Sequence, residues 1–443
     1  MSLPEYAEYK DSGVEWLGEL PSHWTVRKFR HSFQESSEKI DGNVIGPMLS
    51  VSGYRGIEIK DYDDENRRRT DEELQGYRIV RPGQLVVNTM WLNYAGLGVS
   101  VHEGHVSPAY RAYSISEYFE PRFVHHMMRS GEFVKGYAKF LTGIRPNSLQ
   151  MSRDDLMEFR LAEPPREEQA AIADFLDRET AKIDALIAEQ EALLALLAEK
   201  RQATISHAVT RGLDPDVPMK DSGIAWLGEV PAHWGVRPLK AIVSTPITDG
   251  PHETPEFLEE GVPFVSAEAV SGGAINFEKV RAYISHEDDM RYSQKYKPQL
   301  HDIYMVKSGA TTGVTAIVEG RTDFNIWSPL AAIRCNTQMA DPYYVLNYLR
   351  SKNFQEAVAL NWSFGIQQNI GMGVLGDLAV VLPPLEEQRE IARHLDSQLG
   401  VFPTMREAAE TAVTLLRERR SALIAAAVTG KIDVRGQAEV HAA

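Results

Sequence analysis

The sequence is poor in the residues that support covalent cross-links or membrane insertion. Its single cysteine, Cys335 among 443 residues, excludes an internal disulfide and a zinc site built from several cysteines. It has no run of about 18 apolar residues, which a membrane-spanning helix would need. Its first residues lack the basic and apolar regions of a secretory signal. These absences predict a protein of the reducing cytoplasm.

Positive charge is also scarce. Lys and Arg number 47 against 62 Asp and Glu, which gives a formal net charge of −15. Such a balance argues against an extensive nucleic-acid-binding surface, because binding DNA requires basic side chains to neutralise phosphates. Net charge describes the average surface, however, and a local basic groove remains compatible with it.

Motifs for catalysis are missing as well. The chain has no G-x-x-x-x-G-K-[ST] loop and no G-x-G-x-x-G fingerprint, so nothing indicates nucleotide hydrolysis or dinucleotide binding. The segment LPPL (382–385) lacks the polar and aromatic residues that flank the two prolines in amino-methyltransferases. His125 and His126 are adjacent and are interpreted as ordinary helix residues. We expect no catalytic residue, metal or cofactor in this chain.

What the sequence does contain is a duplication. KDSGVEWLGELPSHWTVR (10–27) returns as KDSGIAWLGEVPAHWGVR (220–237), with 13 of 18 positions identical. PPREEQAAIADFLD (164–177) likewise returns as PPLEEQREIARHLD (383–396), with 9 of 14 identical. The chain therefore reads twice as a head, a variable domain and a helical tail. The period exceeds 200 residues, which indicates two copies of one unit and not a solenoid.

The tails carry clear helix signals. Acidic residues follow Pro164 and Pro165, where they suit the first turn of a helix, and Gly212 is a suitable stop. A heptad-like stripe follows, formed by Leu176, Ile183, Leu186, Leu193 and Leu197. In the second tail, Gly400 and Pro403 interrupt the pattern, and Thr404 with Glu407 forms a capping box. This predicts a break at 400–404 and a new helix starting at Thr404.

The variable segments alternate short β-rich runs, Gly-rich turns and helical patches, which is typical of mixed α/β domains. The predicted fold class is α+β: two mixed α/β domains separated by two long antiparallel helices, with a pseudo-twofold internal duplication. The predicted parts are a head with the first variable domain (1–165), a central helix (166–212), the repeated head with the second variable domain (213–384), a distal helical region (385–435) and a tail (436–443).

Polar loops in the variable domains are the candidates for binding. Asn and Gln amides can read adenine through paired hydrogen bonds. The alternatives are a solvated turn for the arginine run and, for WLNYAG (91–96), a hairpin whose aromatics fill the core, an interpretation slightly favoured for Trp91. The candidates are Arg67, Arg68, Asn93, Tyr94, Arg145, Asn147, Gln150, Thr248, His252, Thr311, Thr312, Gln367, Gln368 and Asn369.

Taken together, the KDSG-x-x-WLGE-x-P-x-HW heads, the PP-x-EEQ helix starts, TDGPHETPEFLEEGVPFVS (248–266) and NTMWLNYAGLGVS (88–100) resemble the specificity subunits of type I restriction–modification systems. This resemblance implies two target-recognition domains, each reading one half of a split double-stranded DNA target. It also implies helices that set the spacer, two methyltransferase subunits using S-adenosylmethionine, and restriction subunits using ATP and Mg.

The resemblance leaves other functions open. One is DNA recognition within a stand-alone adenine methyltransferase or another phage-defence complex that lacks a restriction subunit. An enzyme with an unrecognised motif and a purely architectural coiled coil are further alternatives. Partner-binding residues are predicted in the repeated heads and on the helix stripe: Trp16, His23, Trp24, Leu176, Ile183, Trp226, His233 and Trp234.

Overall fold

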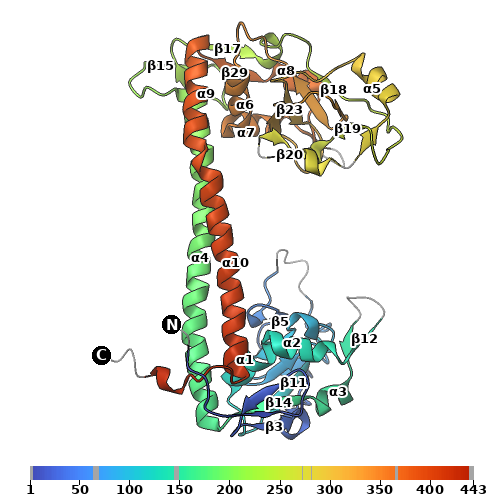
Figure 1. The fold of residues 1–443 in the computed structure, drawn as a ribbon, viewed down its shortest axis with the longest axis vertical. Coiled ribbons are helices and arrows are strands. Elements are labelled where there is room, and N and C mark those ends of the chain that lie inside the picture. Colours follow the sequence, from blue (N-terminus) through green and yellow to red (C-terminus); the bar gives the residue numbers. More distant parts are fainter. Residues whose placement is uncertain are drawn as a thin grey trace. The chain divides into compact units, whose positions relative to one another are not determined.

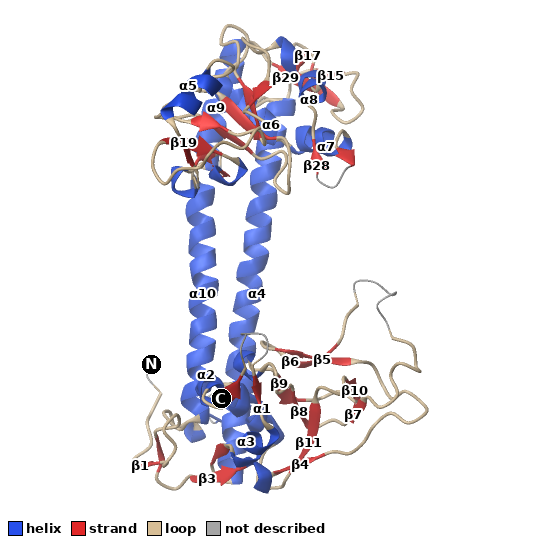
Figure 2. Ribbon diagram, turned by 90° about the vertical axis from the view of Figure 1, so that its right-hand side faces the viewer, coloured by secondary structure: helices blue, strands red, loops and turns tan. Residues whose placement is uncertain are grey.

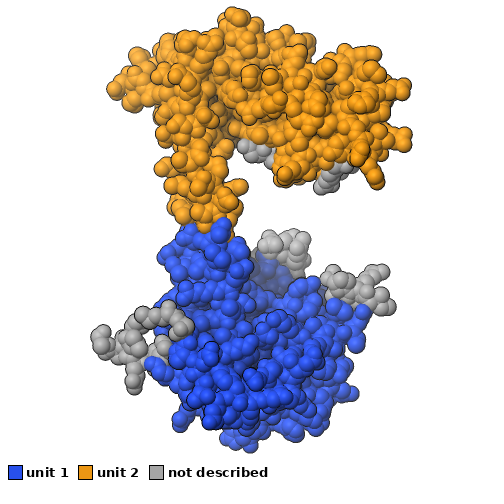
Figure 3. All heavy atoms as spheres, in the orientation of Figure 1, with its two compact units in different colours: residues 1–191, 411–443 blue, residues 192–410 orange. Residues whose placement is uncertain are grey.

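The computed structural model describes residues 3–62, 69–143, 149–271, 273–280, 282–364 and 368–438. It divides into two compact units (Figure 3). Unit 1 comprises residues 1–191 and 411–443, and unit 2 comprises residues 192–410. Unit 1 therefore contains both ends of the chain, whereas unit 2 is continuous in sequence. Each unit is described by itself below.

In unit 1 a mixed α/β domain follows the head (Figure 1). Its helices are α1 (Pro121–Arg129), α2 (Gly131–Ala138) and α3 (Arg153–Glu158). Its strands are β1 (Tyr9–Asp11), β2 (Glu19–Pro21), β3 (Thr25–Lys28), β4 (Phe33–Glu35), β5 (Leu49–Ser52), β6 (Gly56–Ile59), β7 (Arg78–Val80), β8 (Leu85–Val87), β9 (Leu97–Val99), β10 (Gly104–Val106), β11 (Arg111–Ile115), β12 (Leu141–Thr142), β13 (Gln150–Met151) and β14 (Arg160–Glu163).

Unit 2 repeats this plan. Its helices are α5 (His286–Ser293), α6 (Pro342–Arg350), α7 (Lys352–Leu360) and α8 (Met372–Asp377). Its strands are β15 (Met219–Asp221), β16 (Glu229–Pro231), β17 (Gly235–Pro238), β18 (Thr248–Asp249), β19 (Val262–Val265), β20 (Val270–Ser271), β21 (Ala274–Ile275), β22 (Tyr283–Ile284), β23 (Ile303–Val306), β24 (Thr315–Ile317), β25 (Asn325–Ile326), β26 (Leu330–Ile333), β27 (Ser363–Phe364), β28 (Gln368–Asn369) and β29 (Ala379–Leu382).

The central sheets of the two units share one strand order. Unit 1 has β4-β11-β8-β9, and unit 2 has β18-β26-β23-β24 extended by β21 and β20. The middle strands β8 and β23 are fully buried runs of apolar, mostly β-branched residues, which suit strands covered on both faces. Helix α1 packs beside β9, and α6 packs beside β24. The two domains therefore share a core and differ in what surrounds it.

Long helices complete both units (Figure 2). Helix α4 runs over Arg166–Arg211, α9 over Leu385–Leu399 and α10 over Val401–Val428. Within unit 1, Ile183 and Ile187 of α4 pack against Val413 of α10. This contact uses residues four apart, so Leu186, which was expected on the buried stripe, lies beside the contact and is exposed; Leu193 is exposed as well. That part of the stripe prediction is wrong.

The junction of α9 and α10 also differs from the prediction. Only Gly400 separates the helices, and its φ of −59° and ψ of −24° are right-handed helical values. Helix α10 begins at Val401, so the predicted start at the Thr404 capping box is wrong. Pro403 falls in the first turn, where a backbone N–H has no intrahelical acceptor and its loss costs little. Among the residues described, no helix has the length and apolar character that crossing a bilayer requires.

Candidate nucleic-acid interface

The repeated motifs join each head to a helix. In unit 1, the Glu168 carboxylate accepts a hydrogen bond from Trp24 Nε1 at 3.0 Å, lies 2.8 Å from His23 Nε2, and also accepts one from the Tyr6 hydroxyl. In unit 2, Glu387 accepts a hydrogen bond from Trp234 Nε1 at 3.0 Å and lies 2.9 Å from His233 Nε2. The second glutamate of PP-x-EEQ thus anchors the His-Trp pair of the head. We call this arrangement the clasp.

The glutamine of the same motif ties the helix start to the variable domain. Gln169 donates from Nε2 to the carbonyl oxygens of Pro164 and Tyr118, both at 2.9 Å, and its Oε1 accepts the backbone N–H of Glu120 at 2.8 Å. Gln388 makes the same three bonds in unit 2. Both glutamines are fully buried. The repeated residues therefore serve the scaffold, and candidates for DNA contact lie among the residues that differ.

Burial limits which predicted partner-binding residues can face another protein. Trp24, Trp234, Leu176 and Ile183 are buried inside their own units. Each indole fills a core and donates to a clasp glutamate, and each helix residue packs within unit 1. The prediction that these four form a partner surface is corrected on that ground.

The other predicted partner-binding residues retain some surface. His23 and His233 are exposed. Trp16 is half-buried, with ring contacts to Phe159 at 4.9 Å and Phe133 at 4.8 Å between centroids. Trp226 is also half-buried. Of the eight predicted partner-binding residues, these four keep solvent-accessible surface.

In unit 2, the structure brings two predicted loops together. Gly309 donates its backbone N–H to Gln368 O at 3.0 Å, and Ile370 donates to Lys307 O at 2.9 Å. The loop that carries Thr311 and Thr312 is thereby bonded to β28, which carries Gln368 and Asn369. Gln368 and Thr311 are exposed. Gln367 lies outside the described residues.

A third predicted loop is attached through a carboxylate. Asp249 receives Lys295 Nζ at 2.7 Å and Lys307 Nζ at 3.2 Å, and His252 Nε2 lies 3.0 Å away. Burial opposes ionisation of Asp249, but the hydrogen bonds from the two lysines prevail and lower its pKa. Thr248 lies half-buried in β18, and His252 is exposed. Sequence reasoning missed Lys307, which connects all three loops; its only signal was a lysine directly after the apolar run that became β23.

In unit 1 the corresponding loop carries an aromatic pair. Trp91 and Tyr94 are 53% and 54% exposed, with ring centroids 6.0 Å apart. Leu92 is the buried residue of this short 3-10 helix, η3 (Leu92–Tyr94). The favoured interpretation that Trp91 fills the core is therefore wrong. Asn93 Oδ1 is buried, and no described residue donates a hydrogen bond to it.

The hairpin β12–β13 lies next to this loop. Met151 donates its backbone N–H to Thr89 O at 3.2 Å, which places the exposed Gln150 beside the aromatic pair's loop. The remaining candidates of unit 1 fall outside the described residues: Arg67, Arg68, Arg145 and Asn147.

A half-buried arginine fixes the loop base in each unit. Arg129 Nη1 donates to Leu97 O at 2.7 Å and to Ser52 O at 3.1 Å. Arg350 Nε donates to Thr315 Oγ1 at 3.2 Å. Burial lowers the pKa of both guanidinium groups to about 10, so both stay charged near neutral pH. Sequence reasoning missed this pair, although both arginines precede serine at matching places in the two helical patches.

The chain is similar in sequence and fold to known proteins. Residues 232–400 match the model of the type I restriction modification DNA specificity domain. The EcoBI specificity subunit of Escherichia coli is 25% identical over 295 residues, which cover 65% of this chain and 62% of that subunit. The EcoKI specificity subunit of Escherichia coli strain K12 is 22% identical over 324 residues, covering 72% of this chain and 67% of that subunit. The match to EcoBI thus spans less than two thirds of its length.

The fold likeness extends further along the chain. A solved chain from a study of complex assembly and conformational transition of the type I R-M system aligns with a TM-score of 0.64 at 19% identity. The alignment covers 92% of this chain and 98% of that one. The predicted fold class is confirmed, as is the resemblance to the specificity subunits of type I restriction–modification systems.

Proposed function

We propose that this chain is a type I specificity subunit that reads an asymmetric, bipartite DNA target, with one half-site for each unit. The observation that carries the proposal is a division of labour between repeated and variable residues. The repeated residues are used in the clasp and in the glutamine bonds. The variable residues gather as bonded loop clusters, one in each unit, with different side chains. Two copies of one scaffold bearing different surfaces suit two different half-sites.

The loop chemistry fits base readout. In unit 2, exposed Gln368 and the neighbouring Thr311 offer the donors and acceptors that base edges require in the major groove. In unit 1, Trp91 and Tyr94 offer apolar surface suited to a thymine methyl group or a base face. The two half-sites should therefore differ in composition.

Partner proteins would supply the chemistry. We place methylation of adenine from S-adenosylmethionine on two methyltransferase subunits, one against each repeated head. Cleavage that depends on ATP and Mg would belong to restriction subunits. Basic surfaces on these partners would share the phosphate contacts that a chain of net charge −15 lacks.

A domain exchange tests the proposal. Residues 238–382 are replaced by the matching segment of another specificity subunit, and methylated adenines are mapped after co-expression with the methyltransferase. We expect one half-site to change while the other half and the spacer stay the same. Exchanging residues 28–163 is the matched control, which should change the opposite half. A change in both halves from either exchange would contradict the proposal.

The spacer offers a second test. Helix α4 is continuous over 46 residues, so four residues, Leu-Leu-Ala-Glu, inserted after Glu199 should lengthen it by about 6 Å. Since one base pair rises about 3.4 Å and turns about 35°, the preferred spacer should grow by one base pair, or two at most. An unaltered spacer would mean that the helices do not measure it.

A further inference from the structure

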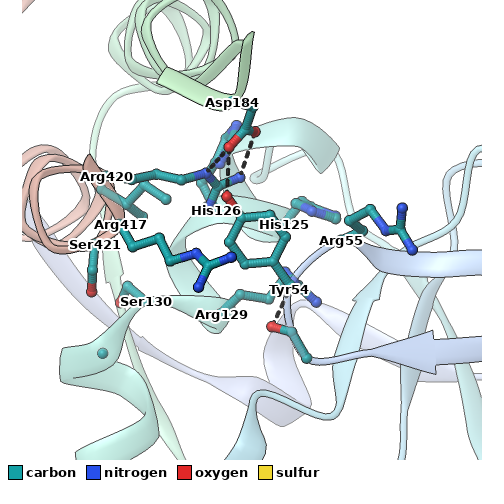
Figure 4. Close-up of a pocket in the computed structure, with 13 residues that line it drawn as sticks. Tyr54, Arg55, His125, His126, Arg129, Ser130, Asp184, Arg417, Arg420 and Ser421 are labelled. Carbon is teal, nitrogen blue, oxygen red and sulfur yellow. Dashed lines mark hydrogen bonds and ion pairs between the residues drawn. The ribbon is translucent and has the colours of Figure 1, made fainter. Parts of the chain in front are cut away.

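Unit 1 contains a pocket of about 450 Å³ where its variable domain meets its helices (Figure 4). Four parts of the chain form it: the turn between β5 and β6, the junction of α1 and α2, a segment of α4 and a segment of α10. The charged and hydroxyl-bearing side chains that concern us are Tyr54, Arg55, Arg129, Asp184, Arg417 and Arg420. Four of these six are arginines, in a chain whose overall charge is strongly negative.

The pocket lining contains a single carboxylate, Asp184, among the described residues. It receives Arg420 Nε at 2.9 Å and Nη2 at 3.2 Å, together with the Tyr54 hydroxyl at 2.6 Å. The Arg420 guanidinium also lies over the Tyr54 ring, 4.6 Å from its centroid. Asp184 is therefore fully engaged in holding one arginine and does not neutralise the other three.

The other three arginines differ in how freely their guanidinium groups can contact a bound anion. Arg417 is 57% exposed and pairs with Glu191 at 2.8 Å, and Arg55 pairs with Glu58 at 2.7 Å; both acids lie outside the lining. Exposed pairs of this kind are weak and leave the guanidinium free to engage another anion. Half-buried Arg129 contacts backbone carbonyls, and no carboxylate in the described part of the chain lies within hydrogen-bonding distance of it.

His125 does not supply the charge. Burial lowers the pKa of His125 to about 3, so that its ring is neutral at physiological pH, and its Nδ1 accepts the Val99 N–H at 3.3 Å. His126 Nε2 lies 2.7 Å from Asp177. The permanent positive charges of the lining are its four arginines.

We propose that this pocket binds a phosphodiester group of the DNA backbone beside the half-site read by unit 1, with Arg417 and Arg55 as the direct contacts. The inference rests on the proposed function and deepens it. Planar guanidinium groups match the oxygens of a phosphate in pairs. Phosphate contacts of this kind fix the register of a protein on the duplex.

The side chain of Arg129 links the pocket to the loop that carries Trp91 and Tyr94. Arg129 lines the pocket and donates to Leu97 O at 2.7 Å and to Gly53 O at 3.0 Å. Gly53 in turn lies against the backbone of Tyr94: a Cβ added to Gly53 would come within 2.6 Å of Tyr94 O. A phosphate seated in the pocket would therefore be held at a fixed distance from the exposed aromatic pair.

The helical repeats of unit 2 lack two of the charged side chains that line this pocket. In the aligned helical repeats, Ala198 stands in place of Arg417 and Pro403 in place of Asp184. The phosphate contact is therefore expected at one half-site only, which makes it detectable against the other half as an internal reference.

The test measures binding of the full chain to a duplex that contains its mapped target, from about 50 to 300 mM salt. Arg55→Gln combined with Arg417→Gln is compared with Arg30→Gln combined with Arg389→Gln, which removes the same charge from exposed pairs elsewhere. We expect the pocket variant to bind several-fold more weakly. Its slope of log K against log salt should be shallower by about 0.9 for each phosphate that the variant no longer neutralises. The control should keep the wild-type slope.

A second measurement needs no variant. Single neutral methylphosphonates are placed along the duplex and assayed with the wild-type chain. We expect one position beside the first half-site to weaken binding, and the pocket variant to be insensitive to the same substitution. Additive losses at every position, an unchanged slope, or a slope change equal to that of the control would overturn the inference.

Three further outcomes separate this inference from the proposed function. If the pocket variant binds DNA normally but fails to assemble with partner subunits, the pocket is a protein-binding site and the phosphate assignment is wrong. If the wild-type chain shows no sequence preference in complex with its methyltransferase, the proposed function fails. If wild type discriminates and the variant behaves identically, this inference alone is refuted.

Discussion

The two units build the same clasp with different numbers of donors. In unit 1, Glu168 serves Tyr6, His23 and Trp24, and its side chain is 4% exposed. In unit 2, Glu387 serves only the His-Trp pair, and its side chain is 29% exposed. The position that matches Tyr6 is Asp216, which is exposed. The same motif thus gives clasps that are buried to different extents, because the residues that flank the motif determine how much water reaches the glutamate.

The chain ends account for the difference. In unit 1, Asp433 donates its N–H to Pro4 O at 2.7 Å, and Tyr9 donates its hydroxyl to Gly430 O at 3.1 Å. The first and last described residues therefore cover the clasp together. In unit 2 the head continues directly from α4, and Gly212, one position beyond the residue aligned with Gly430, ends that helix beside Trp234. We therefore expect the contribution of each clasp to folding stability to depend on how well the clasp is shielded from water, as well as on its hydrogen bonds.

Removing the clasp carboxylates should reveal the largest difference in stability between the two units. Glu168→Ala leaves the buried Trp24 indole and Tyr6 hydroxyl without an acceptor, and we expect a loss of about 3–4 kcal/mol of unfolding free energy. Glu387→Ala should cost about 1–2 kcal/mol, because water can reach the freed groups. Urea unfolding followed by hydrogen exchange on peptides from each unit separates the two effects. Glu168→Gln, which keeps an acceptor, should recover part of the loss; equal losses from the two alanine variants would refute the burial argument.

The paired glycines should give the next largest difference. Gly430 has φ 69° and Gly212 has φ 82°, both in the left-handed region. A Cβ at Gly430 would clash with Pro21, whereas one at Gly212 would lie 3.3 Å from Trp234. We expect Gly430→Ala to cost about 2–3 kcal/mol, combining backbone strain with overpacking, and Gly212→Ala about 1–2 kcal/mol from strain. Gly436→Ala, which meets open space, is the control for thermal melting; the reverse order would be contrary evidence.

Recognition should respond separately in the two units. Gln368→Ala should weaken target binding by about 1–3 kcal/mol and relax one base position in the second half-site. Trp91→Ala should cost about 1 kcal/mol and affect only the first half-site. Selection from a randomised duplex library measures both. If either variant alters the half-site assigned to the other unit, the separation of the loop clusters is wrong.

The smallest expected effect is the response to acid. Partners of opposite charge lower the pKa of Asp249 in unit 2 and of Glu35 in unit 1 against the opposing effect of burial. A carboxylate whose pKa is lower in the folded state stabilises the fold above its unfolded pKa of about 4, and this contribution is lost as pH falls through the folded value. Unfolding curves of Asp249→Asn and Glu35→Gln should therefore differ from wild type near pH 7 and converge on it below about pH 3. A gap that persists in acid would assign both residues a role independent of charge.

The sequence predicted the scaffold because the scaffold is repeated. The limits of α4 and the repeated plan of head, variable domain and helical tail follow from period, punctuation and duplication. The direction of side chains within irregular segments does not follow from these signals. Trp91 and Leu92 are equally apolar neighbours, and a 3-10 helix buries the leucine where a hairpin would have buried the tryptophan.

The repeated heads were misjudged in part for a related reason. A tryptophan that is repeated in both heads is compatible with a partner surface and with a buried clasp. Only the hydrogen bond from Trp24 to Glu168 distinguishes these two possibilities. Pro403 was taken as a helix breaker because its place in the first turn depends on where α10 begins. Arg129 and Lys307 bind groups distant in sequence, so the weak local signals at these positions did not reveal their partners.

The division of the chain between the units has a consequence for its synthesis. A ribosome releases residues in order, and unit 2 is complete once residue 410 has emerged, whereas unit 1 must wait for residues 411–443. The domain that begins first therefore finishes last, with the surfaces of α1 and α4 that α10 will cover left open meanwhile. The second variable domain should reach its native state while the first is still waiting for the helix that closes it, which reverses the usual N-terminal-first order of folding during translation.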